Sequence, residues 1–319
     1  MNERSPLSRR RFLATSSLAA TAAASALWLD PRSLFAQDPA VPDMVVKIRA
    51  QVAKAKIRTQ TLRGNVSALL GSGGNIAVLP GKDGKVIVDS GFASSRPHIT
   101  AALDALSADP VSHLINTHWH FDHTDGNEWL HGAGATILAH ENTKTRLSTV
   151  QTVTAWEVTF PPSPAGAIPT ETFTDKKTLH LNGATIELVH YDPSHTDTDI
   201  SIYFTEADVL HAGDTWWNGF YPFIDYSTGG NINGMIRATE RTLADATAKT
   251  IIIPGHGPIG DKIQLIAYRD VLVSARDSVA ALKKQGKTLP EVIAAKPTAA
   301  YDAKWGDSTD FLGYVYQGV

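Results

Sequence analysis

The sequence predicts an α/β fold for residues 55–275, and three observations support this class. Short β-rich runs alternate with helical patterns over that stretch. Candidate metal ligands follow the C-terminal ends of the apolar runs. The 319 residues are 43% hydrophobic and 19% charged, which is typical of a globular protein with a sizeable core. Because loops at one edge of a sheet converge, these ligands are expected to meet in space.

The first elements of this domain are expected to be strands followed by one helix. Residues 57–80 and 84–91 carry β-rich runs joined by glycine-rich turns. Within them "GSGGN" (71–75) lacks the spacing and the following helix of a phosphate-binding loop, so it is interpreted as a hairpin turn. Residues 95–108 have apolar side chains at helical spacing, which predicts an amphipathic helix.

The later elements place one candidate ligand after each strand. Apolar runs are expected to end just before His195, at Gly213–Asp214 and just before His256. A long amphipathic helix is predicted over 263–287. The last part of the chain, 276–319, is predicted to be a helical tail that packs on the domain.

The stretch "INTHWHFDHTDGN" (115–127) concentrates imidazoles and a carboxylate. Such groups are ligands of Zn²⁺, and clustering them is otherwise unfavourable. The chain has no cysteine, which excludes a disulfide, a thiolate nucleophile and a zinc–sulfur bond. The sequence therefore predicts a metal site built from His118, His120, Asp122 and His123 and completed by His195, Asp214 and His256.

Four motifs occur in order: H-x-H-x-D-H, a lone histidine, G-D after a strand and G-H-G after a strand. They resemble the metallo-β-lactamase superfamily of hydrolases over about residues 55–275. The resemblance implies a four-layer αββα sandwich with the metals at one edge of the two sheets. It also implies that Asp89 in "VIVDSG" supports the histidine loop without being a ligand. Two zinc ions per chain would be held by His118, His120 and His195 and by Asp122, His123 and His256, with Asp214 bridging them.

The same resemblance implies a reaction on a small-molecule substrate. A hydroxide shared by two zinc ions would attack a carbonyl–heteroatom bond of a lactone, ester, thioester or β-lactam ring. Asp122 would orient it and pass a proton to the leaving group, which makes this residue catalytic as well as a ligand. β-Lactamases with a cysteine ligand place it where this chain has Asp214, and a lysine where it has Trp217. The departure favours the glyoxalase II, lactonase and phosphodiesterase branches, with β-lactamase proper as an alternative.

Two other classes of function stay open at this point. One is a mononuclear iron dioxygenase of the same fold that oxidises sulfur compounds, although the presence of all seven ligand positions argues against it. The other is a zinc-bearing periplasmic binding module, although structural zinc sites are usually closed and four-coordinate. Aromatic residues beside the motifs either line a substrate pocket or fill the core. We assign to the pocket Trp119, Trp216, Trp217 and Tyr221.

The first 36 residues are expected to be an export signal. Arg9 and Arg10 precede Phe12 and an alanine-rich run, which resembles a twin-arginine signal for proteins exported in the folded state. An ordinary secretory signal is the alternative. Cleavage is expected after Ala36 or, alternatively, after Ala26.

The mature chain is expected in the periplasm or outside the cell, with residues 37–54 as a lead segment. The net charge of −3 provides no basic face for nucleic acid. The apolar run of the signal is too short for a membrane span, so none is expected after its removal. The sequence leaves the oligomeric state open.

Overall fold

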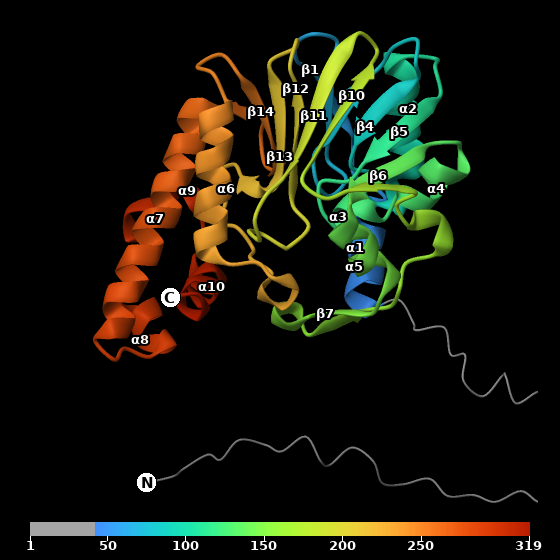
Figure 1. Cartoon of the computed structure of the whole chain (residues 1–319). Helices are drawn as coiled ribbons and strands as arrows, with labels where there is room; N and C mark the ends of the chain where they lie inside the picture. Colours follow the sequence, from blue (N-terminus) through green and yellow to red (C-terminus); the bar gives the residue numbers. More distant parts are fainter. Residues whose placement is uncertain (1–41) are drawn as a thin grey trace, which may run out of the picture. The chain divides into compact units, whose positions relative to one another are not determined.

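The computed structural model describes residues 42–319, which contain two large sheets (Figure 1). The expected export signal and the start of the lead segment lie outside the described residues. One sheet has seven strands, in the order β1 (Arg58–Thr61), β2 (Ser67–Leu70), β3 (Ile76–Leu79), β4 (Lys85–Val88), β5 (Val111–Ile115), β6 (Thr136–His140) and β9 (Glu171–Phe173). The other has six, in the order β10 (Lys176–Leu181), β11 (Ala184–His190), β12 (Ile200–Phe204), β13 (Val209–Trp217), β14 (Ile251–His256) and β15 (Gly260–Asp261).

Helices cover the outer faces of both sheets, so the described residues form four layers (Figure 1). Helices α2 (Arg96–Leu106) and α4 (Asn127–Gly132) pack on the seven-stranded sheet, and α6 (Ile232–Asp245) and α7 (Lys262–Lys284) on the six-stranded sheet. The αββα architecture is confirmed. The other elements are the helices α1 (Asp43–Val52), α3 (Phe121–Thr124), α5 (Glu141–Ser148), α8 (Leu289–Ala294), α9 (Ala299–Trp305) and α10 (Thr309–Gln317), and a separate hairpin of β7 (Gln151–Val153) and β8 (Val158–Phe160).

The main core lies between the two sheets. Val86 and Ile115 of the seven-stranded sheet meet Ile186, Ile202 and Ile253 of the six-stranded sheet in one fully buried cluster. Burying each such side chain stabilises the fold by about 1.5–3 kcal/mol. This packing fixes the relative positions of the strand ends that carry the candidate ligands.

The strand directions explain why these ends share an edge. Strands β4, β5, β6 and β9 are parallel to one another, and β13 is parallel to β14. Strand β11 runs in the same direction as β13, because both are antiparallel to β12. The C-terminal ends of β11, β13 and β14 therefore lie at one edge of their sheet.

The local predictions held in the main, with three corrections at strand ends. The turn at 71–75 joins antiparallel β2 and β3, and α2 and α7 form where they were expected. Strand β11 ends at His190, five residues before His195. Strand β13 continues through Asp214 to Trp217, and β14 includes His256. Both residues therefore lie within strands, where the sequence suggested loops; Asp214 lies at an irregularity of the β13–β14 pairing, and His256 pairs with Trp217.

The C-terminal part of the chain continues the outer helical layer. The expected boundary between 275 and 276 falls inside α7, whose N-terminus is closed by a capping box of Asp261 and Gln264. Phe311 and Leu312 of α10 then join the apolar cluster under α6 and α7. These contacts bring α10 to the side of the six-stranded sheet.

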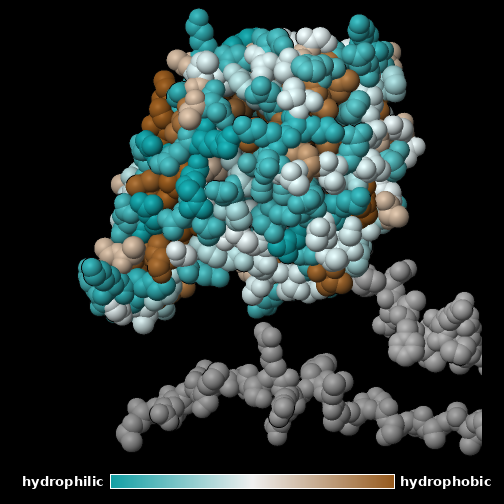
Figure 2. Space-filling model, in the orientation of Figure 1, coloured by the Kyte–Doolittle hydropathy of each residue, from teal (hydrophilic) through white to brown (hydrophobic). Residues whose placement is uncertain are grey.

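The surface in Figure 2 is largely hydrophilic, with hydrophobic residues gathered at the left of the view, beside α6 and α7. Ile263 and Ile266 of α7 are the large exposed apolar side chains of that helix. Within residues 42–319, none of the helices combines the length and the apolar character that a bilayer crossing requires.

Candidate metal centre

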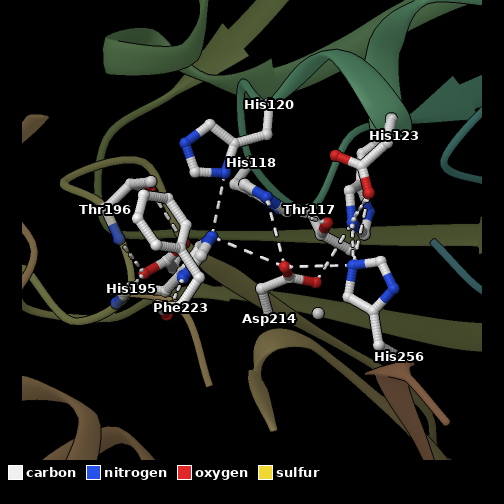
Figure 3. A network of polar contacts seen from close by, with 12 residues as sticks. Thr117, His118, His120, His123, His195, Thr196, Asp214, Phe223 and His256 are labelled. Atoms are coloured by element: carbon white, nitrogen blue, oxygen red, sulfur yellow. Dashed lines mark hydrogen bonds and ion pairs between the residues drawn. The ribbon is translucent and has the colours of Figure 1, made fainter. Parts of the chain in front are cut away.

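All seven predicted ligands converge at one edge of the two sheets (Figure 3). They come from segments that are far apart in the sequence. They are His118 and His120 after β5, Asp122 and His123 in α3, His195 after β11, Asp214 in β13, and His256 at the end of β14.

Three of them, which we call the closed group, are buried imidazoles: His118, His120 and His195. One nitrogen from each lies within 4.8 Å of the others. The shortest approach is 2.9 Å, between Nε2 of His195 and Nδ1 of His120. This is the geometry of three histidines around one cation.

Three others, which we call the open group, are Asp122, His123 and His256. Nε2 of His256 lies 3.2 Å from Oδ2 of Asp122 and 3.4 Å from Nε2 of His123. The side chains of Asp122 and His256 are 18% and 22% exposed, whereas those of the closed group are at most 2% exposed. Solvent therefore reaches the centre from the side of the open group.

Asp214 lies between the two groups, as Figure 3 shows. Its Oδ1 is 3.1 Å from Nε2 of His123, and its Oδ2 is 3.3 Å from Nε2 of His256. On the other side, Oδ2 is 3.5 Å from Nε2 of His195 and 3.9 Å from Nε2 of His118. One carboxylate thus faces ligand atoms of both groups.

The charges of the open group are strongly coupled. Burial alone would lower the pKa of His256, but the carboxylates of Asp214 and Asp122 outweigh burial and raise this pKa to about 9. The same carboxylates raise the pKa of His123 well above its usual value, against the effect of burial. Burial would raise the pKa of Asp122, but His123 and His256 lower it to about 2. Without a metal, protons on the two histidines balance the carboxylates.

The closed group behaves in the opposite way. Burial, together with nearby His123, holds the pKa of His118 well below its usual value, and burial also lowers the pKa of His195. Both imidazoles are therefore neutral at pH 7, which is the form that binds metals. Nε2 of His118 is buried without a hydrogen-bond partner, and such an atom is costly unless a ligand satisfies it. The residues of both groups fit divalent cations.

The expected support for the histidine loop lies beneath His123. Oδ2 of Asp89 is 2.7 Å from Nδ1 of His123, which leaves Nε2 of that ring directed at the centre. The same carboxylate accepts hydrogen bonds from the backbone N–H and the hydroxyl of Thr117, both at 2.7 Å. Asp89 thereby fixes the start of the H-x-H loop and the orientation of one ligand.

Asp225 plays the corresponding part for the closed group, and it was not among the residues predicted from the sequence. Its Oδ2 is 3.1 Å from Nε2 of His120, which directs Nδ1 of that ring toward His195. Asp225 also accepts hydrogen bonds from the backbone N–H of Ser227 and the hydroxyl of Thr228. Carboxylates behind metal-binding histidines fix the tautomer and the ring orientation.

Two further supports come from loops whose role the sequence did not reveal. Oδ2 of Asp199 accepts hydrogen bonds from the hydroxyl of Ser194 and the backbone N–H of His195, at 2.6 and 2.7 Å. Asn75, in the turn at 71–75, donates to the carbonyls of Pro254 and Gly257 on either side of His256.

The same turn also needs glycine for steric reasons. A Cβ on Gly74 would lie 2.0 Å from Cε1 of His123. The turn therefore serves the metal centre as well as the hairpin, and the pair Gly73–Gly74 is the sequence signal that could have indicated a close approach.

The four aromatic residues assigned to the pocket separate into different environments. Trp216 is fully buried and Tyr221 is 9% exposed in the cluster under α7 and α10, so their assignment to the pocket is corrected to the core. The reason is that successive residues of a strand face opposite sides, so Trp216 and Trp217 diverge. Trp119 is buried behind His120 and donates to the hydroxyl of Thr228. Trp119 also lines a cavity of about 610 Å³, together with Phe121 and Phe160. Trp217 lies beside the partly exposed His256, with its ring 4.4 Å from that of His256.

Comparison with known families agrees with this geometry. Residues 70–287, more than half of the chain, match the Metallo-beta-lactamase superfamily. The chain belongs to the metallo-beta-lactamase superfamily. The resemblance drawn from the motifs is confirmed for the family, whose fold binds divalent metal through His/Asp clusters, and both groups have the geometry of such clusters.

Individual members of the superfamily are distant from this chain. It is 27% identical over 187 residues to a hydroxyacylglutathione hydrolase of Polaromonas sp., covering 52% of this chain and 62% of that protein. It is 25% identical over 214 residues to the beta-lactamase-like protein 2 homolog of Caenorhabditis elegans, covering 64% and 59%. Each match spans less than two thirds of the relative's length.

Solved structures establish the fold. The DIM-1 metallo-beta-lactamase superposes with a TM-score of 0.56 at 21% identity, over 70% of this chain and 100% of that chain. The sec-alkylsulfatase Pisa1 from Pseudomonas sp. superposes with a TM-score of 0.61 at 17% identity, over 88% and 53%.

Proposed function

We propose that this protein is a metal-dependent hydrolase that uses two zinc ions per chain to cleave a carbonyl–heteroatom bond of a small molecule. The observation that carries the proposal is the position of Asp214, within 3.9 Å of ligand atoms of both the closed and the open group. A site for a single metal has no need of a carboxylate that faces two sets of ligands. The matches to hydrolases of the superfamily support the same reaction class.

The bound ions would supply Lewis-acid activation of water and of the scissile carbonyl. The chain's own groups determine the geometry and the proton transfer. Asp122 is ionised at neutral pH, since its pKa is about 2, and it is partly exposed beside the centre. It accepts the proton of the attacking water and returns it to the leaving heteroatom. Asp89 and Asp225 hold His123 and His120 in their orientations.

The test is metal analysis of the purified protein combined with a hydrolysis panel of lactones, esters, thioesters, phosphodiesters and β-lactams. We expect two equivalents of zinc and turnover of at least one carbonyl substrate. The metal-free protein, prepared with a chelator, is the matched control and is expected to be inactive until zinc is restored. One equivalent of iron, with oxygen-dependent turnover of a sulfur compound, would contradict the proposal.

We also propose that the protein is exported in the folded state. The support is the order of Arg9, Arg10 and Phe12 ahead of an alanine-rich run. Changing both arginines to lysine is expected to leave the precursor in the cytoplasm. Immunoblotting of cell fractions measures the export. If the double variant is exported as well as the wild type, the signal is an ordinary secretory signal.

A further inference from the structure

The closed group is bordered by aromatic rings that come from three separate parts of the fold. Trp156, at the tip of the β7–β8 hairpin, has its ring 5.5 Å from that of His120. Phe223, in the loop after β13, lies 5.9 Å from His120 and 5.7 Å from His195. Figure 3 shows the Phe223 ring beside His195. Tyr314 of α10 packs edge-on against Phe223 at 5.2 Å.

These rings offer an apolar surface with hydrogen-bond donors that are free of protein partners. Trp156 and Tyr314 are only partly buried, and neither the indole N–H of Trp156 nor the hydroxyl of Tyr314 has a hydrogen bond within residues 42–319. Burial and the nearby charge of Asp310 raise the pKa of Tyr314 to about 12, so its hydroxyl stays neutral. A neutral donor beside aromatic rings suits the uncharged oxygen of an ester or lactone.

Two arginines that line the cavity beside Trp119 and Phe121 are already paired with carboxylates, so neither is free to hold an anionic substrate. Arg49 makes two side-chain contacts with Asp125. Arg146 makes two with Asp197 and donates a further hydrogen bond to Gln151. The faces of aromatic rings carry negative potential, so a carboxylate would be disfavoured against them.

A cationic group would need open aromatic faces, and these rings do not provide a cage. Trp156 and Phe223 are stacked on each other, with centroids 4.6 Å apart and planes at 28°. Tyr314 meets Phe223 edge-on at 77°. One face of each stacked ring is already covered, which favours an apolar group over a cation.

We infer that the substrate is an uncharged ester or lactone whose apolar acyl group lies against Trp156, Phe223 and Tyr314. This inference rests on the proposed function and names the substrate class of the same centre. Trp156 and Tyr314 are then specificity residues, supplied by the hairpin and by the C-terminal helix. Trp217 borders the centre at His256 and adds to the apolar wall.

The first experiment compares three esters of similar length on the zinc-loaded protein. They are 4-nitrophenyl hexanoate, the mono-4-nitrophenyl ester of adipic acid, and 4-nitrophenyl 4-(trimethylammonio)butanoate. We expect kcat/KM for the hexanoate to exceed kcat/KM for each charged ester by about tenfold or more, because each buried methylene contributes about fourfold. A preference for the carboxylate or for the ammonium ester would overturn the inference.

The variant Trp156→Ala should remove most of this preference, mainly through KM, with little change for the charged esters. Trp156→Phe should restore part of it, and Tyr314→Phe should weaken binding of the ester oxygen while leaving the effect of chain length in place. The control is Trp129→Ala, since Trp129 of α4 is also partly buried but packs beneath Arg96 of α2, against the cluster on the outer face of the seven-stranded sheet. An unchanged ratio in Trp156→Ala, with normal folding, would contradict the assignment.

A second measurement separates this inference from the hydrolase proposal. Calorimetric titration with hexanamide and with its terminal carboxylate analogue, adipic acid monoamide, reports binding without turnover. Hexanamide should bind the zinc-loaded protein at least tenfold more tightly than the acid, and Trp156→Ala should abolish the difference. If no ester or lactone is hydrolysed but this difference is present, the reaction is wrong and the apolar subsite stands. If esters are hydrolysed but the two amides bind equally, the subsite is wrong and the reaction stands.

Discussion

The two ligand groups of the metal centre differ in burial, charge and support. The closed group consists of three imidazoles that are shielded from solvent, two of them held neutral by burial. The open group combines a carboxylate with two histidines of raised pKa and is partly exposed at Asp122 and His256. This difference indicates that the two groups have different roles. The closed group is suited to anchoring a metal, and the open group to exchange with water and to proton transfer.

Because Asp214 lies between the two groups, its replacement is expected to have the largest effect on metal content and activity. Asp214→Ala should lose both metals and lower kcat/KM by roughly 10³-fold or more, because metal ions supply several kcal/mol of transition-state stabilisation. Metal content by mass spectrometry and hydrolysis rates check this. Asp192→Ala, at an exposed aspartate three residues before His195, is the control and should behave like the wild type. Retention of two metals in Asp214→Ala would refute the bridging role.

Removing one histidine from each group tests their separate roles. After dialysis, His256→Ala should keep about one tightly bound equivalent, because the buried closed group is intact. His118→Ala should keep less, since its remaining site is exposed to solvent. Each variant should lose on the order of a hundredfold in kcat/KM or more. Equal metal retention by the two variants would show that the groups do not differ as anchors.

The carboxylates behind the two groups allow a matched pair of substitutions. Asp225→Asn should weaken metal binding at the closed group by about 10–100-fold, and Asp89→Asn should do the same at the open group. In each case the amide no longer stabilises the orientation of the histidine it touches, His120 or His123. Chelator competition on each variant measures the two equivalents separately. If both substitutions weaken the binding of the same metal equivalent, the assignment of Asp225 to the closed group and of Asp89 to the open group is contradicted.

The pH dependence of metal binding provides the finest comparison. The pKa of His256 is about 9 in the metal-free protein, so a metal entering the open group must displace its proton below that pH. Affinity there should fall about tenfold for each displaced proton per pH unit as pH decreases. The pKa values of His118 and His195 are lowered, so binding at the closed group should depend less on pH than binding at the open group. Chelator competition at pH 6, 7 and 8 checks the two slopes, and equal slopes would contradict this account.

The sequence alone predicted the class of the fold and the seven residues that the structure brings together. Each of them follows or ends an apolar run, and such ends meet at one edge of the two sheets. The exact strand ends were missed because β13 and β14 continue through Asp214 and His256, beyond the apolar run that marked them. Local pattern also could not separate Trp216 from Trp217, since adjacent strand residues face opposite sides and only packing shows which side is the core.

Only the tertiary structure decided what surrounds the ligands. Asp225 contacts His120 across 105 residues of sequence, and the turn with Gly74 reaches His123 from another strand pair. The hairpin with Trp156 and the helix with Tyr314 both contact Phe223, although they lie far apart in the sequence. Such contacts leave no periodic signal, because each depends on how distant elements pack and not on neighbours in the chain. The seven clustered residues could therefore be predicted from the sequence, whereas their supports and the proposed substrate wall required the folded arrangement.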